Sequence, residues 1–231
     1  MKANTAPDLR HDEVACRADV TGNHNGAGQG GQAALQLSWP SLAMPRPSSM
    51  PPDFSQLLAH LDAYASRWSD EAASVQTFSD FLRSDSAVFE RHFAVAHFTG
   101  SAWLVSADGD RALLMHHRKL GLWLQPGGHA DGDSDLAGVA LREAQEETGV
   151  RDLFVEGGIF DIDRHRISAR GSEPEHWHYD VRYVVRAGSD ERFAINEESH
   201  ALAWRSVVEI ASDATLDASL RRMASKWLTV R

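Results

Sequence analysis

The sequence predicts an α/β fold, namely an α/β/α sandwich with a mixed sheet, preceded by a short helical segment. Three observations favour it. Apolar residues recur every three or four positions over residues 54–82, as on one face of a helix. Segments rich in β-branched and aromatic residues follow, between residues 93 and 207. Two further amphipathic segments separate and close these strands, so helices can cover both faces of one sheet.

Residues 1–53 differ from the rest of the chain. Stretches such as "TGNHNGAGQGGQAA" and "PSLAMPRPSSMPPD" are rich in Gly, Pro, Ser and Asn and have no sustained period. Such segments bury too little apolar surface to offset the entropy of ordering, so a disordered tail is expected. Residues 54–92 are expected to form a helical extension, with apolar faces around Leu61 and Phe78, and residues 93–231 the main domain.

The strands of the main domain are expected in five regions. "FAVAHFTGSAWLVSAD" (93–108) has β-rich ends on either side of an expected turn at Thr99–Gly100, and "RALLMHHR" follows an Asp-Gly-Asp turn. The segments "VEGGIFDIDRHRI", "HWHYDVRYVVRA" and "HALAWRSV" read as later strands. "LDASLRRMASKWL" is expected to be a closing amphipathic helix.

Composition narrows the classes of function. The formal net charge of −10 disfavours a nucleic-acid-binding surface, which needs a basic face. The single cysteine, Cys16, excludes an internal disulfide framework and suits a reducing compartment. No apolar run approaches the roughly 18 residues of a membrane span, and the N-terminus lacks a secretory h-region. A cytoplasmic protein without a membrane partner is expected, and a homodimer is left open.

A crowded acidic turn is the most informative local feature. In "LREAQEETG", Glu143, Glu146 and Glu147 are neighbours on one side of a helix because they are three and four residues apart. Their mutual repulsion and the negative end of the helix dipole both disfavour this arrangement. A divalent cation would neutralise the charges, and Mg²⁺ binds carboxylate oxygens while bridging phosphates. The turn therefore indicates a metal site, although a solvated helix face has a similar sequence.

The surrounding residues give this turn a wider context. Gly128, thirteen intervening residues and then "REAQEETGV" (142–150) closely resemble the Nudix box, G-x5-E-x7-R-E-U-x-E-E-x-G-U, in which U is a bulky aliphatic residue. The resemblance extends over about residues 93–210. Two positions depart from the pattern. Ala144 replaces a bulkier aliphatic residue, and Ser134 occupies the place of the first glutamate, flanked by Asp133 and Asp135. Asp133 is expected to take over as a carboxylate, and Ser134 mainly to cap the helix.

The resemblance implies a reaction. Nudix hydrolases cleave a diphosphate linked to another group by attack of water on phosphorus, with Mg²⁺ or Mn²⁺ as cofactor, so a small-molecule diphosphate is the implied substrate. By position, Glu146 and Glu147 are metal ligands, Glu143 is a further ligand or the general base, and Arg142 orients Glu143. The implied catalytic residues are therefore Arg142, Glu143, Glu146 and Glu147, and the implied metal ligands are Glu143, Glu146, Glu147 and Asp133. An additional acidic residue from outside the box is expected among Glu173, Glu175, Glu197 and Glu198.

Substrate-binding residues are expected in two places. Gly127 and Gly128 shape the loop beneath the site, next to His129. In an extended strand, His176, His178, Asp180 and Arg182 would share one face, opposite Trp177, Tyr179, Val181 and Tyr183. Gly127, Gly128, His129, His176 and His178 are accordingly the predicted substrate contacts. An ordinary polar strand face and a separate metal site, with His129 or with His116 and His117, are the alternatives.

Competing functions can be weighed against the same residues. A Nudix-like ligand sensor without strong hydrolase activity is the main alternative, because Ser134 breaks the box. Isopentenyl-diphosphate isomerisation on this fold uses a catalytic cysteine, and the only cysteine lies in the expected tail. Messenger-RNA decapping would need a basic surface. The sequence does not select one diphosphate among sugar nucleotides, dinucleoside polyphosphates, ADP-ribose-like cofactors and oxidised nucleotides.

Overall fold

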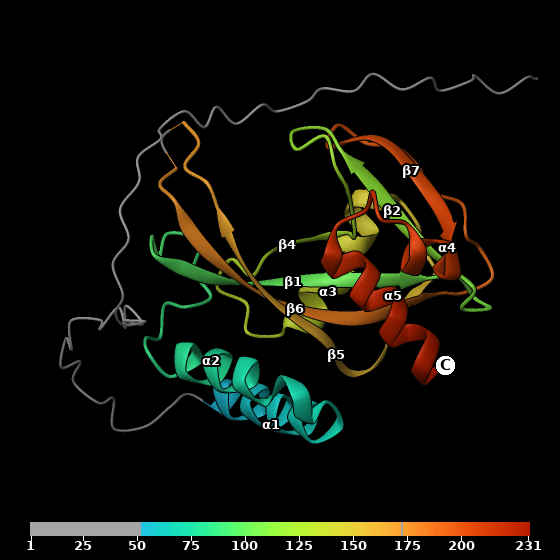
Figure 1. Ribbon diagram of the computed structural model, residues 1–231. Helices are drawn as coiled ribbons and strands as arrows, with labels where there is room; N and C mark the ends of the chain where they lie inside the picture. The colour runs from blue at the N-terminus through green and yellow to red at the C-terminus, as the bar shows by residue number, and fades with distance from the viewer. Residues whose placement is uncertain (1–51, 172) are drawn as a thin grey trace, which may run out of the picture. The chain divides into compact units, whose positions relative to one another are not determined.

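The computed structural model describes residues 52–171 and 173–231, and Figure 1 shows its arrangement. The expected tail therefore lies almost wholly outside the described residues. The elements run in the order α1 (Pro52–Arg67), η1 (Ser69–Glu71), α2 (Ala72–Leu82), β1 (Ala96–Val105), β2 (Arg111–His117), β3 (Trp123–Leu124), β4 (Gly127–His129), α3 (Leu136–Thr148), β5 (Leu153–Ile167), β6 (His176–Ala187), β7 (Ser199–Ser206), α4 (Val207–Ser212) and α5 (Ala218–Val230).

One mixed, seven-stranded sheet forms the middle layer. Its strand order is β3-β2-β1-β6-β5, with β4 paired to β1 and β7 paired to β2. β1 and β6 are parallel along ten consecutive residue pairs, from Ala96 and Trp177 to Val105 and Arg186, and the other pairs are antiparallel. Since β1 lies next to β2, β4 and β6, it is the strand around which the sheet is assembled.

Helices cover both faces of the sheet, as the predicted α/β/α sandwich requires (Figure 1). The alternation of side chains along β1 divides the core in two. Phe98 and Leu104 pack with α1, α2 and α3, whereas Trp103 and Val105 pack with α4 and α5. The helical extension is thus part of the main core: Leu61 and Leu82 are fully buried, and Phe78 is nearly so.

Two local predictions were wrong. No turn interrupts residues 93–108 at Thr99–Gly100, because both residues lie within the continuous strand β1. Gly100 is there for close packing: a Cβ at this position would lie 2.7 Å from the Leu136 carbonyl oxygen of α3. The stretch "SAVFERHF" is a series of turns and not a helix, although Val88 and Phe89 are buried. The short strands β3 and β4 were not predicted.

No helix in the described part of the chain has the length and apolarity needed to cross a membrane.

Candidate active site

The helix that carries the acidic turn has well-defined ends. α3 begins after Asp135, whose carboxylate accepts a hydrogen bond from the Gly138 N–H at 3.1 Å. It ends at Gly149, which adopts a left-handed conformation with φ of 69° and donates its N–H to the Gln145 carbonyl. The predicted capping role of Ser134 was therefore wrong. Asp135 is one residue nearer the helix, and its side chain reaches the free N–H groups.

Glu147 is the most deeply buried of the three acidic residues. Its side chain is only 5% exposed, and its Oε2 accepts a hydrogen bond from the Gly127 N–H at 2.9 Å. Burial is the main cause that raises the pKa of Glu147, to about 8; the Gly127 N–H opposes this, and Glu143 and Glu198 add to it. Without a cation, this carboxyl group is therefore largely protonated at neutral pH.

Glu143 lies one turn earlier and is fitted closely to β4. An added Cβ at Gly128 would lie 2.5 Å from the Glu143 carboxyl carbon, so glycine at this position leaves the carboxylate in place, whereas a larger residue would displace it. Burial raises the pKa of Glu143 as well, although Arg142 lowers it in part. Arg142 Nη2 lies 3.7 Å from Glu143 Oε1, and Arg142 Nη1 lies 3.8 Å from Asp133 Oδ2. Arg142 thus links the predicted substitute for the first box glutamate to Glu143.

The structure also distinguishes among the four acidic residues outside the box. Glu198 lies close enough to Glu147 to raise its pKa, and it also raises that of Glu143. The Asn196 side chain positions this segment: its amide donates to the Glu146 carbonyl at 3.2 Å and its oxygen accepts from the Glu198 N–H at 3.0 Å. Glu173 and Glu175 pair instead with Arg91 and Arg166, respectively.

These residues fit a hard divalent cation. The donors are carboxylate oxygens, which Mg²⁺ and Mn²⁺ prefer. Glu198 disfavours the charged forms of Glu143 and Glu147, and Glu143 disfavours that of Glu147, which a cation would reverse. Glu146 is exposed on the same helix, one residue from Glu147. The carboxylates are not tightly gathered: within the described residues, three ligand atoms come within 4.8 Å of one another only in a histidine group.

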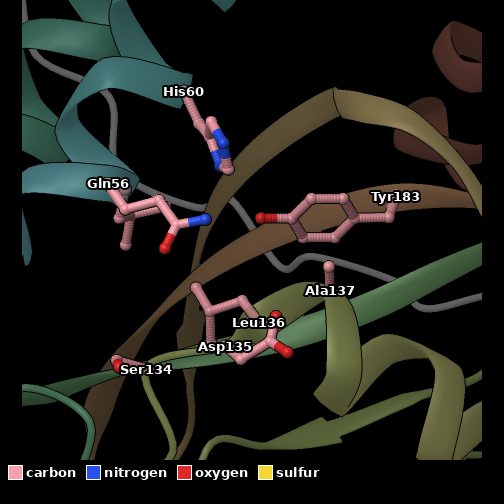
Figure 2. A pocket seen from close by; sticks show the side chains of 8 residues that line it. Gln56, His60, Ser134, Asp135, Leu136, Ala137 and Tyr183 are labelled. Atoms are coloured by element: carbon pink, nitrogen blue, oxygen red, sulfur yellow. The ribbon is translucent and has the colours of Figure 1, made fainter. Parts of the chain in front are cut away.

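A cavity of about 210 Å³ lies at the other end of α3 (Figure 2). Gln56 and His60 of α1 face it from one side, and the Tyr183 hydroxyl of β6 points into it from another. It includes Ser134 and Asp135 but none of the acidic residues of the box. Glu143 and Glu147 lie roughly 10–16 Å further along the helix axis, given a rise of 1.5 Å per residue. This cavity is therefore distinct from the acidic site.

The predicted face of β6 is confirmed, and its histidines join a larger group. His178 pairs in register with His97 on β1 and with His165 on β5, so three adjacent strands each contribute one histidine. The His97 ring lies 5.0 Å from that of His129 and 4.8 Å from those of His176 and His178, between centroids. We define the histidine cluster as His97, His129, His165, His176 and His178. His116 and His117 do not belong to it; His116 lies beside Trp123 and His200.

Burial keeps three members of the histidine cluster uncharged. Desolvation is the main cause that lowers the pKa of His97 to about 4 and of His178 to about 2, and neighbouring histidines add to it. The pKa of His129 is lowered too, first by burial and then by Arg91. These imidazoles are therefore neutral at physiological pH, and neutral rings attract phosphate weakly.

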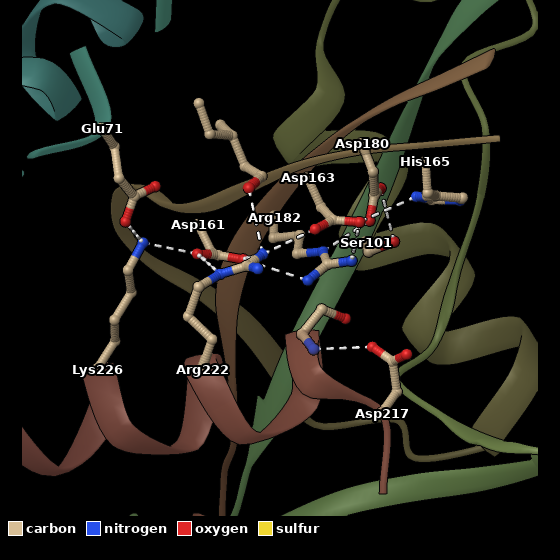
Figure 3. A network of polar contacts seen from close by, with 12 residues as sticks. Glu71, Ser101, Asp161, Asp163, His165, Asp180, Arg182, Asp217, Arg222 and Lys226 are labelled. Carbon is tan, nitrogen blue, oxygen red and sulfur yellow. Dashed lines mark hydrogen bonds and ion pairs between the residues drawn. The ribbon is translucent and has the colours of Figure 1, made fainter. Parts of the chain in front are cut away.

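Asp180 and Arg182, also on the predicted face, belong to a buried ion network (Figure 3). Arg182 is 2% exposed and donates to Asp180 at 2.7 Å and to Asp161 at 3.2 Å. Asp180 also accepts hydrogen bonds from the Thr99 and Ser101 hydroxyls of β1. The Asp180 carboxylate thus holds β1 to β6 and belongs to this network, whereas the histidines of the same face do not pair with it.

Sequence reasoning missed one residue of these sites and did not single out another. His97 lies in a predicted strand, but its neighbours His129 and His178 come from β4 and β6, which are distant in the sequence, so no local pattern singles it out. Glu198 was one of four predicted candidates, and the hydrogen bonds of Asn196 and of the Arg118 N–H hold its segment beside the helix. Spacing within one helix or strand could find neither.

Comparisons with known proteins were made for the whole chain. A family model described as the NUDIX domain matches residues 97–227. Among solved structures, the chain is similar to an Ap4A hydrolase of C. elegans in a binary complex, with 16% identity, 57% of this chain and 95% of the other covered, and a TM-score of 0.46. It is similar to a MutT protein from Methanosarcina mazei Go1, with 21% identity, 59% and 96% covered, and a TM-score of 0.44. It is similar to the E. coli dihydroneopterin triphosphate pyrophosphohydrolase, with 14% identity, 58% and 96% covered, and a TM-score of 0.45. The comparison with curated proteins gave no match.

Proposed function

Because this chain belongs to the NUDIX domain family, we propose that it is a pyrophosphohydrolase that uses Mg²⁺ or Mn²⁺ to hydrolyse a diphosphate-linked small molecule, such as a nucleoside diphosphate derivative. The observation that carries the proposal is the buried Glu147 carboxyl group, held by the Gly127 N–H beside Glu143 and Glu198. Neighbouring carboxyl groups that raise the pKa of a buried one do not stabilise a fold, and a cation bound to them and to a phosphate would remove the repulsion.

In this proposal the protein residues have separate tasks. Glu146 and Glu147 hold the cation, and Glu198 joins them from outside the box. A divalent cation bound there would supply positive charge to the phosphate oxygens and lower the pKa of a bound water. Glu143 serves as a further ligand or as the general base that accepts the proton of the attacking water, and Arg142 orients its carboxylate.

The neighbouring residues support this arrangement. Gly127 fixes Glu147 through its N–H, and Gly128 leaves room for the Glu143 carboxylate. The predicted ligand role of Asp133 stays a prediction; its observed partner is Arg142, through which it can hold Glu143 in place. Substrate contacts by Gly127, Gly128, His129, His176 and His178 also stay predictions. With a net charge of −10, we expect a small anionic substrate held through the cation and no nucleic acid.

A panel of diphosphate compounds tests the proposal. With Mg²⁺ or Mn²⁺, hydrolysis of at least one class of compound is expected, measured as released phosphate after treatment with a phosphatase. EDTA should abolish it and excess Mg²⁺ should restore it. Glu147→Gln should lower turnover by about 10², or roughly 2.7 kcal/mol of barrier, whereas exposed Glu209→Gln in α4 should not. Full activity in EDTA would refute the mechanism.

A ligand sensor is the second candidate, and Ser134 in place of the first box glutamate is the observation that favours it. A hydrolase and a sensor differ in whether the bound diphosphate is cleaved. A sensor would bind one of the diphosphates, as measured by calorimetry with Mg²⁺, and leave it intact over hours. The ion pair of Asp133 with Arg142 favours the hydrolase. Asp133 is next to Ser134, so a carboxylate adjacent to the position of the first box glutamate still contacts the box arginine.

A further inference from the structure

We propose that His97, His129 and His178 form a second metal site, which binds a transition-metal ion such as Zn²⁺ and is separate from the acidic site. Each of the three offers a ring nitrogen, and these nitrogens all lie within 4.8 Å of one another. Around a tetrahedral Zn²⁺ with Zn–N distances of 2.0–2.1 Å, ligand nitrogens are about 3.3 Å apart. Rotation of the imidazole rings can close the difference.

The buried His97 side chain lacks hydrogen-bond partners, which indicates that it binds a ligand. Its side chain is 2% exposed, and neither ring nitrogen makes a hydrogen bond with any described residue. The Phe93 backbone raises its pKa slightly without meeting hydrogen-bond geometry. A buried imidazole ordinarily finds at least one partner, since an unsatisfied polar atom costs about 1–3 kcal/mol. His129 Nε2 is also buried without a partner in this part of the chain. A metal ion would satisfy both rings.

The hydrogen bonds of His176 fix its tautomer, with the lone pair on Nε2. Its Nδ1 lies 2.9 Å from the Pro174 carbonyl oxygen, which can only accept, so Nδ1 carries the proton and the Nε2 lone pair accepts from His178 Nε2–H, a hydrogen bond that a bound metal would replace. A backbone carbonyl that fixes the tautomer in this way is typical of metal-binding histidines. His176 Nε2 lies 3.1 Å from His178 Nε2, close to the separation of two ligands on one ion. His176 is therefore the candidate for a fourth ligand.

The two metal sites lie on opposite faces of the sheet. A Cβ at Gly128 would meet Glu143, so Gly128 faces α3, whereas a Cβ at Gly127 would meet the Ser101 side chain on the other face. His129 is two residues from Gly127 and shares its face. It is paired with Thr99, which lies two residues from His97 on β1. The histidines therefore cannot join Glu143 and Glu147 around one ion.

The chemistry of the donors separates the two sites as well. Imidazole nitrogens suit Zn²⁺, Ni²⁺ and Cu²⁺, whereas Mg²⁺ requires oxygen ligands and binds imidazole poorly. The lowered pKa values keep the rings in the neutral form that a metal needs. Neutral rings favour a metal over a phosphate group as the occupant. The ion would join β1, β4 and β6 near the ends of these strands.

Titration with Zn²⁺ tests the site. Tag-free protein in excess Mg²⁺, which occupies the acidic site, should bind one equivalent of Zn²⁺ in calorimetry. His97→Gln and His178→Gln should each weaken binding by at least about tenfold. Glu147→Gln and the exposed His200→Gln should leave Zn²⁺ binding unchanged. Absence of Zn²⁺ binding would overturn the proposal, and so would binding lost in Glu147→Gln but kept in His97→Gln.

A second measurement needs no variant and remains decisive if a substituted chain fails to fold. The side-chain ¹⁵N resonances of the histidines can be followed by NMR during addition of Zn²⁺ in excess Mg²⁺. Those of His97, His129 and His178 should shift together at one equivalent, because coordination changes the ring nitrogen that binds. Resonances of His60 and His200 should stay in place. Shifts confined to histidines outside the cluster, or no shifts, would overturn the site.

Discussion

At the scale of single residues, Glu147 couples the stability of the fold to pH. Its pKa rises from an ordinary value of 4.5 to about 8 in the folded, metal-free protein. Between these pH values the folded chain binds more protons at Glu147 than the unfolded chain does. The free energy of unfolding therefore falls as pH rises from about 4.5 to 8, and the contribution of the protonated group is lost above the folded pKa.

Glu147→Gln removes this titration and should therefore stabilise the metal-free protein at high pH. In EDTA at pH 8, the variant should exceed the parent in free energy of unfolding by on the order of a few kcal/mol, since each pKa unit is worth about 1.4 kcal/mol. The difference should vanish toward pH 4.5. Urea titrations at several pH values measure it, with Glu209→Gln as control. A variant less stable than the parent at pH 8 would contradict this account.

At the scale of elements, β4 sets the position of the catalytic helix through its two glycines. The Gly127 N–H binds Glu147, and Gly128 lies against the Glu143 carboxyl group. β4 in turn pairs with β1 through Gly128 and Gly100, and Gly100 is packed against α3. The close approach of the helix to the sheet thus depends on positions that carry no side chain.

Gly128→Ala should impair metal binding while the fold is retained. The added methyl group would displace the Glu143 carboxylate, since Cβ and Cδ cannot lie 2.5 Å apart. We expect Mn²⁺ affinity, measured by electron paramagnetic resonance, to fall by roughly tenfold. Gly158→Ala is the matched control, because that glycine, also in a strand, has no atom within 4 Å of an added Cβ. Equal Mn²⁺ affinity in both variants would count against the role given to Gly128.

The elements also show how far the sequence could predict the structure. α3 and its acidic turn were predictable, because helix periodicity and the Gly149 cap are local. β4 was not, because Gly127 and Gly128 read as a loop until β1 supplies their pairing partners. The turn expected at Gly100 failed for the same reason: glycine signals a turn locally, but here it serves contact with α3. The positions of His97 and Glu198 in their sites depend on contacts with residues that are distant in the sequence, which no local pattern predicts.

At the scale of the whole molecule, the buried ion network joins the helical extension to the closing helix. Asp161 is fully buried and accepts hydrogen bonds from Lys226 at 2.6 Å, Arg222 at 2.8 Å and Arg182 at 3.2 Å. Lys226 Nζ also lies 2.5 Å from Oε1 of Glu71, which is in η1 between α1 and α2. One carboxylate on β5 therefore contacts three cations from α5 and β6, whose other partners are Asp163, Asp180 and Glu71.

Asp161→Asn should destabilise the protein by about 3–5 kcal/mol, because it removes the buried charge with which Arg182, Arg222 and Lys226 all pair. Urea unfolding measures the change, and moderate salt should not restore stability, since buried charges are poorly screened. Asp190→Asn, which removes an exposed partner of Arg192, should cause no measurable loss. Equal stability of the two variants would show that the network contributes little to the fold.

The contact between Lys226 and Tyr64 has a consequence for the order of events during synthesis. The Lys226 ammonium donates to the Tyr64 hydroxyl at 2.5 Å, and the two residues are 162 positions apart. On the ribosome, α1 and α2 emerge long before their polar partner has been translated. The apolar faces around Leu61 and Phe78 are then exposed to solvent until the strands and the helix that cover them have been translated. A chaperone that shields newly made apolar helices would therefore act on this protein first at its amino-terminal side.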